Sequence, residues 1–331
     1  MYSDRTVGVV VPAYNEEDLI GRVVETMPSY VDRVYLVDDA STDGTWDELT
    51  DAVEAARARD DGEGTFDERW VPIQHAENQG VGGAILTGYR RALADDIDAT
   101  AVMAGDAQMD PDVLPRLLDP VVEGEVEYAK ASRLLRREDW TGMPPVRLVG
   151  NLVLTLLTQI SSGYPEMTDP QNGYTVISQR ALRELDLDSL YEDYGFANDL
   201  LVKLNAEGMA VADVETSSEF VYGDEEWDSH IDLKTFVPKT SVLLLRNFLW
   251  RLKHERGDTA PRPFVVLYAL AVGGVLLGLC LLLSTAAGLG SGDADGTRSA
   301  GIVATSVVSG VLALARDRRV NTGLFTRIYT E

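Results

Sequence analysis

The chain has a single cysteine and few basic residues. Cys280 stands in an apolar run, and one cysteine can form neither an intramolecular disulfide nor a cysteine-based zinc site. Lysine and arginine number 29 against 54 aspartate and glutamate residues, and only 5 of the basic residues are lysines. The net charge of −25 argues against nucleic-acid binding, which needs a positive surface. It indicates a solvated, self-repelling surface, of the acidic and lysine-poor kind that suits a halophile.

Two further signals are missing. Residues 1–6 are polar and lack a basic start followed by an apolar stretch, so we expect no cleaved signal peptide and a chain that stays mostly in the cytoplasm. No Gly-x-Gly-x-x-Gly fingerprint follows the first apolar run, Val7–Val11, which argues against a dinucleotide-binding oxidoreductase.

Up to about residue 216, short β-branched runs alternate with amphipathic stretches. The runs predict strands at 7–11, 34–37, 70–75, 100–104, 128–131 and 174–178, and the stretches predict helices that include 18–27, 45–58 and 81–94. This order predicts an α/β fold with a mostly parallel sheet flanked by helices. Ligands of such sheets bind at the carboxyl ends of the strands, so the residues after each strand are site candidates. The Gly- and acid-rich residues 60–68 predict a surface loop.

The C-terminal part has a different pattern. Residues 263–289 carry no charge and are long enough to span a bilayer, and 299–315 form a second, shorter uncharged run. Basic residues flank the pair, and the loop between the runs is acidic. The positive-inside rule then predicts two transmembrane helices with both flanks in the cytoplasm. A buried helical hairpin in a soluble protein is the alternative. The flanking basic residues are Arg251, Lys253, Arg256, Arg262, Arg316, Arg318 and Arg319.

Upstream of these runs, residues 231–254 have apolar residues at helical spacing with arginine and lysine between them. The pattern predicts an interfacial helix on the membrane surface, with an ordinary packing helix as the alternative. We therefore expect three parts: an α/β domain at 1–228, an amphipathic interfacial region at 229–262 and a membrane anchor at 263–331.

Carboxylates and an aromatic side chain follow the first two predicted strands. Tyr14 and Glu16 come after the first strand, where they could contact a nucleobase and ribose, or where Asn15 could simply cap a helix. Asp38, Asp39 and Asp43 follow the second strand, and a turn needs fewer carboxylates than that. We expect Asp38 and Asp39 to be free to bind a base and ribose.

These elements together resemble the family 2 glycosyltransferases, which have the GT-A fold. The resemblance covers about residues 6–222. It rests on three elements in order: Val11–Glu16, Asp38–Thr45 with its Asp-Asp-x-Ser-x-Asp-Gly-Thr pattern, and Asn78–Ala84, which is followed by Gly88. The resemblance implies a nucleotide-sugar donor beside these elements, with small residues that let the backbone approach the donor phosphates. The donor-binding residues that it implies are Pro12, Tyr14, Glu16, Asp38, Asp39, Asn78, Gly80 and Gly83.

The segment after the fourth predicted strand departs from the family pattern. The family usually carries Asp-x-Asp there to hold a divalent cation on the diphosphate, but Ala104 stands in place of the first aspartate. Asp106 and Gln108 remain. The resemblance implies that these two hold Mg²⁺ or Mn²⁺, cations that prefer hard oxygen ligands.

Later segments resemble the transferases that use a polyprenyl or dolichyl phosphate acceptor. Arg133 follows the fifth strand, where it would grip the acceptor phosphate, although it could be a surface arginine. The resemblance places Asp169 by the reacting centre, where a plain turn is the alternative. It lets Asp199 position the sugar or acceptor, with a simple acid at a helix N-terminus as the alternative. His230, near the Tyr222–Glu225 segment, could help at the acceptor phosphate or be a surface histidine.

The resemblance implies inverting transfer of a hexose from a UDP- or GDP-linked donor to a polyprenyl or dolichyl phosphate at the cytoplasmic face of the cell membrane. The product would feed glycan assembly such as protein N-glycosylation. Partners are the donor, the lipid phosphate and the membrane, with no nucleic acid. No Gln-x-x-Arg-Trp motif occurs in the later chain, which argues against a processive polysaccharide synthase. A transferase with another lipid or protein acceptor, or a non-catalytic nucleotide-sugar-binding scaffold, is the alternative; the scaffold is suggested by Ala104.

Overall fold

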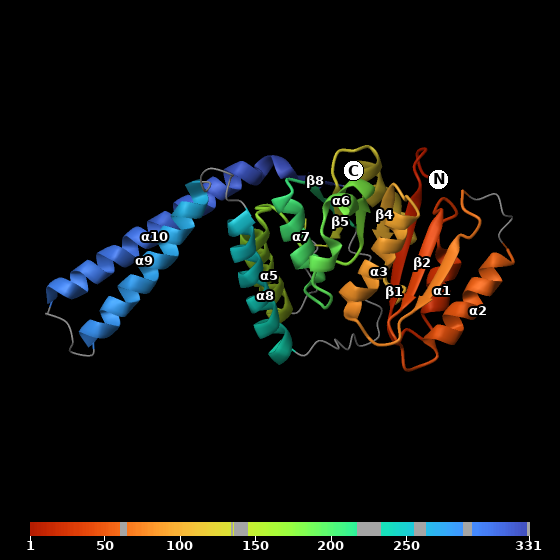
Figure 1. The fold of residues 1–331 in the computed structure, drawn as a ribbon, viewed down its shortest axis with the longest axis horizontal. Helices are drawn as coiled ribbons and strands as arrows, with labels where there is room; N and C mark the ends of the chain where they lie inside the picture. Colours follow the sequence, from red (N-terminus) through yellow and green to blue (C-terminus); the bar gives the residue numbers. More distant parts are fainter. Residues whose placement is uncertain are drawn as a thin grey trace.

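A computed structural model describes residues 1–59, 65–133, 135, 145–216, 233–254, 263–286 and 293–329. Its central feature is one sheet of eight strands in the order β3-β2-β1-β4-β6-β5-β7-β8 (Figure 1). β6 is antiparallel to both of its neighbours, and every other pairing is parallel. The strands are β1 (Val7–Ala13), β2 (Arg33–Asp38), β3 (Trp70–Gln74), β4 (Ala99–Val102), β5 (Tyr128–Ser132), β6 (Thr175–Ser178), β7 (Val211–Glu215) and β8 (Phe325–Ile328).

Helices cover both faces of this sheet because the strand side chains alternate between two apolar cores. Val7, Val9 and Val11 of β1 point into a core with α1 (Ile20–Thr26), α2 (Thr45–Arg57) and α4 (Leu114–Val122). On the other face of the sheet, Val10 packs in a core with a second set of helices. They are α3 (Gly80–Ala94), α6 (Gln179–Glu184) and α7 (Phe196–Ala206). All six predicted strands and the three predicted helices are present, with ends that shift by a few residues.

Two strands were not predicted. β7 falls within the predicted α/β domain. β8 lies in the part of the sequence assigned to the membrane anchor, yet it pairs in parallel with β7. The anchor segment therefore returns to the sheet after its helices. The α/β body is built from residues on both sides of the apolar hairpin.

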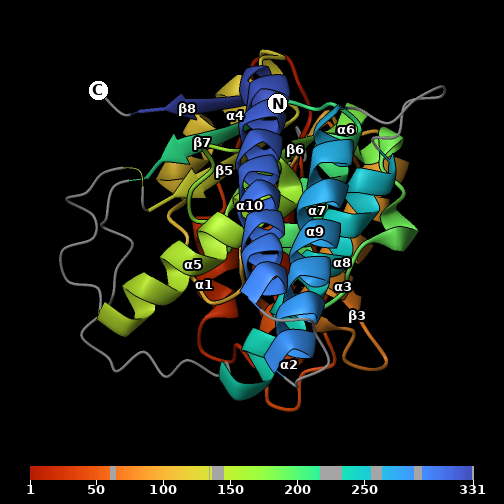
Figure 2. The same cartoon turned by 90° about the vertical axis from the view of Figure 1, so that its left-hand side faces the viewer.

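Four longer helices lie on one side of this body. α5 (Pro145–Ser162) and α8 (Leu233–His254) pack against each other and against α7. α9 (Pro263–Ala286) and α10 (Asp293–Asn321) form an antiparallel hairpin that projects away from the body (Figures 1 and 2). Within the described residues, one segment, Arg298–Leu324, is long and apolar enough to cross a membrane, and Pro263–Gly278 is a shorter apolar helix.

A buried ion pair ties the hairpin to the body. Arg251 of α8 is fully buried, and its guanidinium lies 2.6 Å from the Oδ2 atom of Asp317 in α10. The Tyr268 hydroxyl of α9 donates to the same carboxylate at 3.1 Å, and Asn321 donates to it at 2.8 Å. Arg251 also donates to the Ile160 carbonyl at the end of α5. Arg251 was expected to belong to a cytoplasmic flank by the positive-inside rule. Instead, its charge is neutralised by Asp317 inside the protein.

The pair has a close neighbour in Gly163, which follows α5. Gly163 has φ of +87°, and a Cβ atom at this position would collide with the Arg251 guanidinium. Glycine at this position adopts the left-handed backbone conformation without strain, and its missing side chain leaves the space that the buried arginine occupies.

We expect Asp317→Ala to destabilise the fold by about 3–5 kcal/mol, because it removes the carboxylate that faces the buried Arg251 charge. Thermal unfolding in detergent micelles measures the change. The double variant Arg251→Met with Asp317→Leu should recover most of the loss, since it removes both charges. Glu184→Ala, which breaks an exposed pair with Arg180, is the matched control and should change little. An Asp317→Ala protein that unfolds with the parent would show that the pair does not hold the hairpin.

Candidate functional site

The segments after β1, β2, β3 and β4 meet at one edge of the sheet. The Asp39 amide donates to the Ala13 carbonyl at 2.9 Å, and the Gly105 amide donates to the Pro12 carbonyl at 3.0 Å. The His75 amide donates to the Asp38 carbonyl at 2.9 Å. The parallel strands thus bring the predicted donor-binding residues to a common rim, as their places after the strands indicated.

The segment after β1 turns sharply and leaves Tyr14 at the surface. Asn15 adopts φ of +57°, and its side-chain oxygen accepts a hydrogen bond from the Thr42 amide at 2.8 Å. The Asn15 amide in turn donates to Ser41 Oγ at 2.9 Å. Asn15 therefore joins the β1 and β2 loops rather than capping a helix, and the Tyr14 ring is 46% exposed beside the joined loops.

Glu16 is the most perturbed carboxylate at this rim. Burial raises its pKa to about 7, and the nearby carboxylates of Asp106 and Asp43 add to the shift. Burial likewise raises the pKa of Asp106, partly offset by the Gln108 amide that donates to its carboxylate at 3.0 Å. The rim thus holds carboxylates that repel one another, and a cation placed among them would be stabilised.

Asp38 and Asp39 are not free, contrary to expectation. Asp38 is fully buried and accepts from the Ser41 amide and from the Gln74 side chain at 3.2 and 3.1 Å. Asp39 is 3% exposed and accepts from the Gln79 and Gly80 amides, each at 2.8 Å. Asp39 also lies 2.7 Å from the Nδ1 atom of His75. Asp39 thus anchors the start of α3, where unpaired amides favour a carboxylate.

The glycines at the start of α3 approach protein backbone. A Cβ atom on Gly80, which has φ of +83°, would lie 2.6 Å from the Glu192 carbonyl oxygen. The Gly83 amide donates to this same oxygen at 2.9 Å. Asn78 accepts from the Gly80 amide at 3.1 Å. These small residues were expected to let donor phosphates approach the backbone closely. In the structure they let the loop before α7 approach it.

Asp106 and Gln108 lie where the resemblance puts the metal ligands, after β4. Asp106 is half-buried and Gln108 is exposed. Among the described residues, no three histidine, cysteine or acidic side chains are grouped closely enough to hold a metal by themselves. A carboxylate and an amide oxygen beside the acidic Glu16 still fit Mg²⁺ or Mn²⁺, provided that a ligand supplies further oxygens.

Arg133 and Asp169 form a bidentate pair at the far part of the rim. Arg133 Nε donates to Asp169 Oδ2 at 2.8 Å, and a terminal nitrogen donates to Oδ1 at 3.0 Å. Burial alone would raise the pKa of Asp169, but the hydrogen bonds and charge of Arg133 hold it below its usual value. Asp169 is 3% exposed and the Arg133 side chain is 29% exposed, so Arg133 is the member of the pair that reaches solvent.

A second buried pair, which the sequence analysis missed, supports this arrangement. Lys130 of β5 lies 2.8 Å from Asp213 of β7, and both side chains are buried. Lys130 also donates to the Thr168 and Asp169 carbonyls, while Asp213 accepts from the Thr168 amide at 2.6 Å. The pair fixes the loop on which Asp169 adopts φ of +42°. A lysine in an otherwise apolar strand was the available signal.

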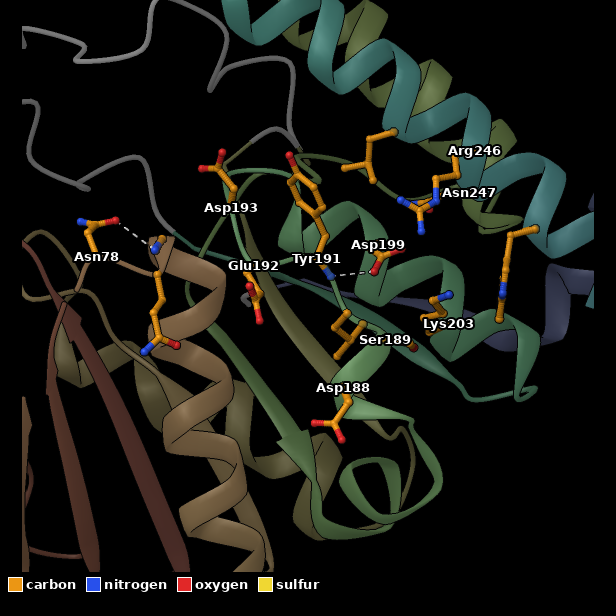
Figure 3. A pocket seen from close by; sticks show the side chains of 15 residues that line it. Asn78, Asp188, Ser189, Tyr191, Glu192, Asp193, Asp199, Lys203, Arg246 and Asn247 are labelled. Atoms are coloured by element: carbon orange, nitrogen blue, oxygen red, sulfur yellow. Dashed lines mark hydrogen bonds between the residues drawn. The ribbon is translucent and has the colours of Figure 1, made fainter. Parts of the chain in front are cut away.

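Asp199 lies in a cavity of about 800 Å³ that borders the start of α3. Its carboxylate accepts from the Tyr191 amide at 3.0 Å, and burial raises its pKa although Lys203 partly offsets this. Asn78 and Gly80 line the same cavity, together with Arg246 and other residues of α8 (Figure 3). Glu16, Asp106 and Arg133 are not among its lining residues.

The predicted site residues therefore fall into three groups. The donor group with Asp106 and Gln108 follows β1–β4, the Arg133–Asp169 pair follows β5, and Asp199 lies in the cavity. The structure brings the first two groups to one edge of the sheet. His230 and Tyr222–Glu225 lie outside the described residues.

The fold is shared with solved enzymes. The glucosyl-3-phosphoglycerate synthase from Mycobacterium tuberculosis, solved with Mg²⁺ and uridine-diphosphate, superimposes with a TM-score of 0.52. It is 19% identical, with 75% of this chain and 80% of that chain covered. The chain therefore has a GT-A-like α/β fold, with the mostly parallel sheet described above.

The chain belongs to glycosyl transferase family 2, whose model matches residues 8–186, more than half of its length. It is 28% identical over 228 residues to the UDP-N-acetylglucosamine–dolichyl-phosphate N-acetylglucosaminyltransferase of Methanococcus voltae, which covers 67% of this chain and 90% of that one. It is 25% identical to the low-salt glycan biosynthesis hexosyltransferase of Haloferax volcanii, over 98% of this chain and 69% of that one.

A third relative is the dolichol-phosphate mannosyltransferase of Pyrococcus furiosus, 22% identical over 74% of this chain and 71% of that one. The chain is thus a glycosyltransferase, and it is similar to enzymes named as dolichyl-phosphate sugar transferases. The sugars in the names of these relatives differ.

The Glu16 carboxyl should titrate near pH 7, because it is buried beside Asp106 and Asp43. Isotope-edited infrared spectroscopy across pH 4–9 would follow it. Asp106→Asn should lower the Glu16 pKa only partly, since burial is the larger cause. Glu16→Gln identifies the band by removing it, and Glu54→Gln on exposed α2 is the matched control. A Glu16 pKa at the ordinary value of about 4.3 would contradict the geometry.

Proposed function

We propose that the protein transfers a hexose from a UDP- or GDP-linked donor to a polyprenyl or dolichyl phosphate, with inversion, at the cytoplasmic face of the membrane. The observation that carries the proposal is the Arg133–Asp169 pair, which presents a fixed guanidinium at the same sheet edge as the donor group. The names of the similar enzymes support the lipid phosphate as acceptor. The product would supply glycan assembly such as protein N-glycosylation.

The reaction forms one bond and breaks one. A phosphate oxygen of the acceptor attacks the anomeric carbon, and the bond from that carbon to the nucleoside diphosphate breaks. The acceptor phosphate is ionised at neutral pH, so no general base has to remove a proton. The work of the protein is to position two anionic groups that repel each other and to stabilise the charge that develops on the leaving diphosphate.

Each half of the rim has a role in this proposal. Pro12, Tyr14 and Glu16 border the nucleotide, and Asp39 shapes the donor side by fixing the start of α3. Arg133 holds the acceptor phosphate, and Asp169 orients the guanidinium by its two hydrogen bonds. Asp199 positions the loop before α7 through the Tyr191 amide.

Asp106 and Gln108 would hold Mg²⁺ or Mn²⁺ on the donor diphosphate. When bound, the cation supplies charge neutralisation for the leaving group. Glu16, whose carboxyl lies near Asp106, is a further acidic group that would face the cation in place of the aspartate that Ala104 replaces.

The hairpin of α9 and α10 serves in this proposal as a two-helix membrane anchor, with the interfacial helix α8 on the membrane surface. Arg298–Leu324 supports one span by length and composition. The anchor keeps the enzyme beside an acceptor whose hydrocarbon tail stays in the bilayer. The acidic surface suits a protein of a salt-rich cytoplasm.

Radiolabel transfer into the organic phase tests the reaction. Membranes that contain the protein are given UDP- and GDP-sugars in turn, with dolichyl phosphate, Mg²⁺ or Mn²⁺, and high salt. We expect label transfer from one donor only, and its loss in Asp106→Ala. Asp112→Ala, which changes an exposed carboxylate six residues further along, is the matched control and should stay active. No transfer from any donor, despite nucleotide binding, would refute the proposal.

Arg133→Lys should keep the charge but lose the bidentate geometry. We expect kcat/KM for the lipid phosphate to fall on the order of 10- to 100-fold, the range of a lost charge-assisted hydrogen bond. The KM for the nucleotide-sugar should change little. Initial rates at varied acceptor concentration measure the effect, and Arg180→Lys at the exposed surface is the control. An equal loss for both substrates would place Arg133 outside the acceptor site.

A further inference from the structure

The residues that precede the two members of the Arg133–Asp169 pair contact each other. Ser132 comes directly before Arg133, and Thr168 comes directly before Asp169. The hydroxyl oxygens of Ser132 and Thr168 lie 2.6 Å apart. Thr168 donates its one hydroxyl hydrogen to Asp213 at 2.7 Å, so Ser132 is the donor in the contact between the two hydroxyls. The two backbones that carry the pair are therefore joined one residue before it.

The register of β5 and β7 places two opposite charges beside this contact. Tyr128 lies beside Val211 and belongs with it to the apolar core of α3, α6 and α7. Two residues further along the same face, Lys130 lies beside Asp213, and their side chains are 1% and 0% exposed. Replacement of a buried ion pair by apolar residues is often neutral or stabilising. Packing of the sheet alone therefore does not account for the two charges.

The ammonium group of Lys130 is surrounded by three oxygen atoms, which match its three donors. It lies 2.8 Å from Asp213 Oδ1 and 3.2 Å from the Asp169 carbonyl oxygen, and it also donates to the Thr168 carbonyl. The two carbonyls belong to the peptide groups on either side of the Asp169 Cα atom. One buried cation thus constrains the backbone of Asp169 from both sides.

The conformation of Asp169 requires such a constraint. Its φ of +42° lies in a region that residues other than glycine seldom adopt, and Pro170 favours an extended conformation for the residue before it. A conformation of this kind persists only where the surrounding structure holds it, and it is common at functional sites. Here the Asp169 carboxylate accepts from the Arg133 amide at 3.3 Å as well as from the guanidinium. The strained backbone therefore serves the contact with Arg133.

We propose that Lys130, Asp213 and Thr168 are positioning residues for the acceptor phosphate. They hold Asp169 in its strained conformation, and Asp169 in turn holds the Arg133 guanidinium in one orientation before the acceptor arrives. A guanidinium that is already ordered loses less conformational freedom when a phosphate binds. The identity of the phosphate as the ligand of Arg133 rests on the proposed function, whereas the positioning of Arg133 does not.

Thr168→Val tests the positioning with little change of shape, because it removes the hydroxyl that joins Asp213 to Ser132. We expect the KM for the lipid phosphate to rise on the order of 10-fold, the range of one lost hydrogen bond to a charged group. The KM for the nucleotide-sugar should change little, since the donor group follows other strands, β1–β4. Thr168→Ser keeps the hydroxyl and should restore most of the loss. Thr26→Val at the exposed end of α1 is the matched control.

A double variant tests whether Thr168 acts through Arg133. In an Arg133→Lys background, the bidentate contact with Asp169 is already lost. The further effect of Thr168→Val on the KM for the lipid phosphate should then be less than about twofold, because residues that act as one unit are not additive.

A second measurement follows the arginine without enzyme activity. Arginine side-chain NMR spectra of the full chain in detergent micelles contain the Nε–H signal of Arg133, which is identified by its loss in Arg133→Lys. We expect this hydrogen to exchange slowly with water in the parent and in Thr168→Ser, and severalfold faster in Thr168→Val. The signal of Arg180, which pairs with Glu184 at the surface, should not change.

Three results would overturn the proposal. The first is an Arg133 signal that exchanges equally in Thr168→Val and the parent. The second is an additive loss in the double variant. The third is an equal rise of both KM values with thermal unfolding at a lower temperature, the pattern of a purely structural role. A parent without transfer activity, but with an Arg133 signal that depends on the Thr168 hydroxyl, would leave the positioning standing and remove the proposed function.

Discussion

The contact between Arg251 and Asp317 joins the two parts of this molecule. A buried arginine is costly unless its charge is neutralised and its donors are satisfied. Here the carboxylate comes from α10, a further acceptor comes from the end of α5, and the space comes from Gly163. The hairpin is therefore attached through a polar contact of defined geometry, rather than through apolar packing alone. β8, which follows the hairpin, adds a second attachment through its pairing with β7.

The rim of the sheet combines two electrostatic regimes. After β1–β4, carboxylates such as Glu16 and Asp106 gather without a cationic side chain among the groups that shift their pKa values. Around β5 and β7, the carboxylates of Asp169 and Asp213 are each paired with a cation. The first half suits a ligand that brings its own cation, and the second suits an anion that meets a fixed guanidinium. This division matches a reaction between two phosphate-bearing substrates.

Much of the α/β body could be predicted from the sequence, because strands buried on both faces give apolar runs and the helices between them give amphipathic stretches. The meeting of the predicted donor-binding residues at one edge of the sheet followed from their places after those strands. β8 could not be predicted, since Phe325–Ile328 is short and its partner β7 is distant in sequence. The hydrogen bonds that Asp38 and Asp39 accept from backbone amides could not be predicted either, because they depend on how loops meet in space.

The place of β8 in the sheet bears on how the protein is made. In the sequence β8 follows the hairpin, so a growing chain produces α9 and α10 before the strand that covers the edge of β7. Asp317, the partner of the buried arginine, is also synthesised after the apolar run of α9. The α/β body consequently stays incomplete until the hairpin has left the ribosome, because β7 lacks its neighbour β8 and Arg251 lacks the Asp317 carboxylate. Completion of the sheet is thus coupled to the placement of α9 and α10. A chain whose hairpin is misplaced cannot add β8 to the edge of β7.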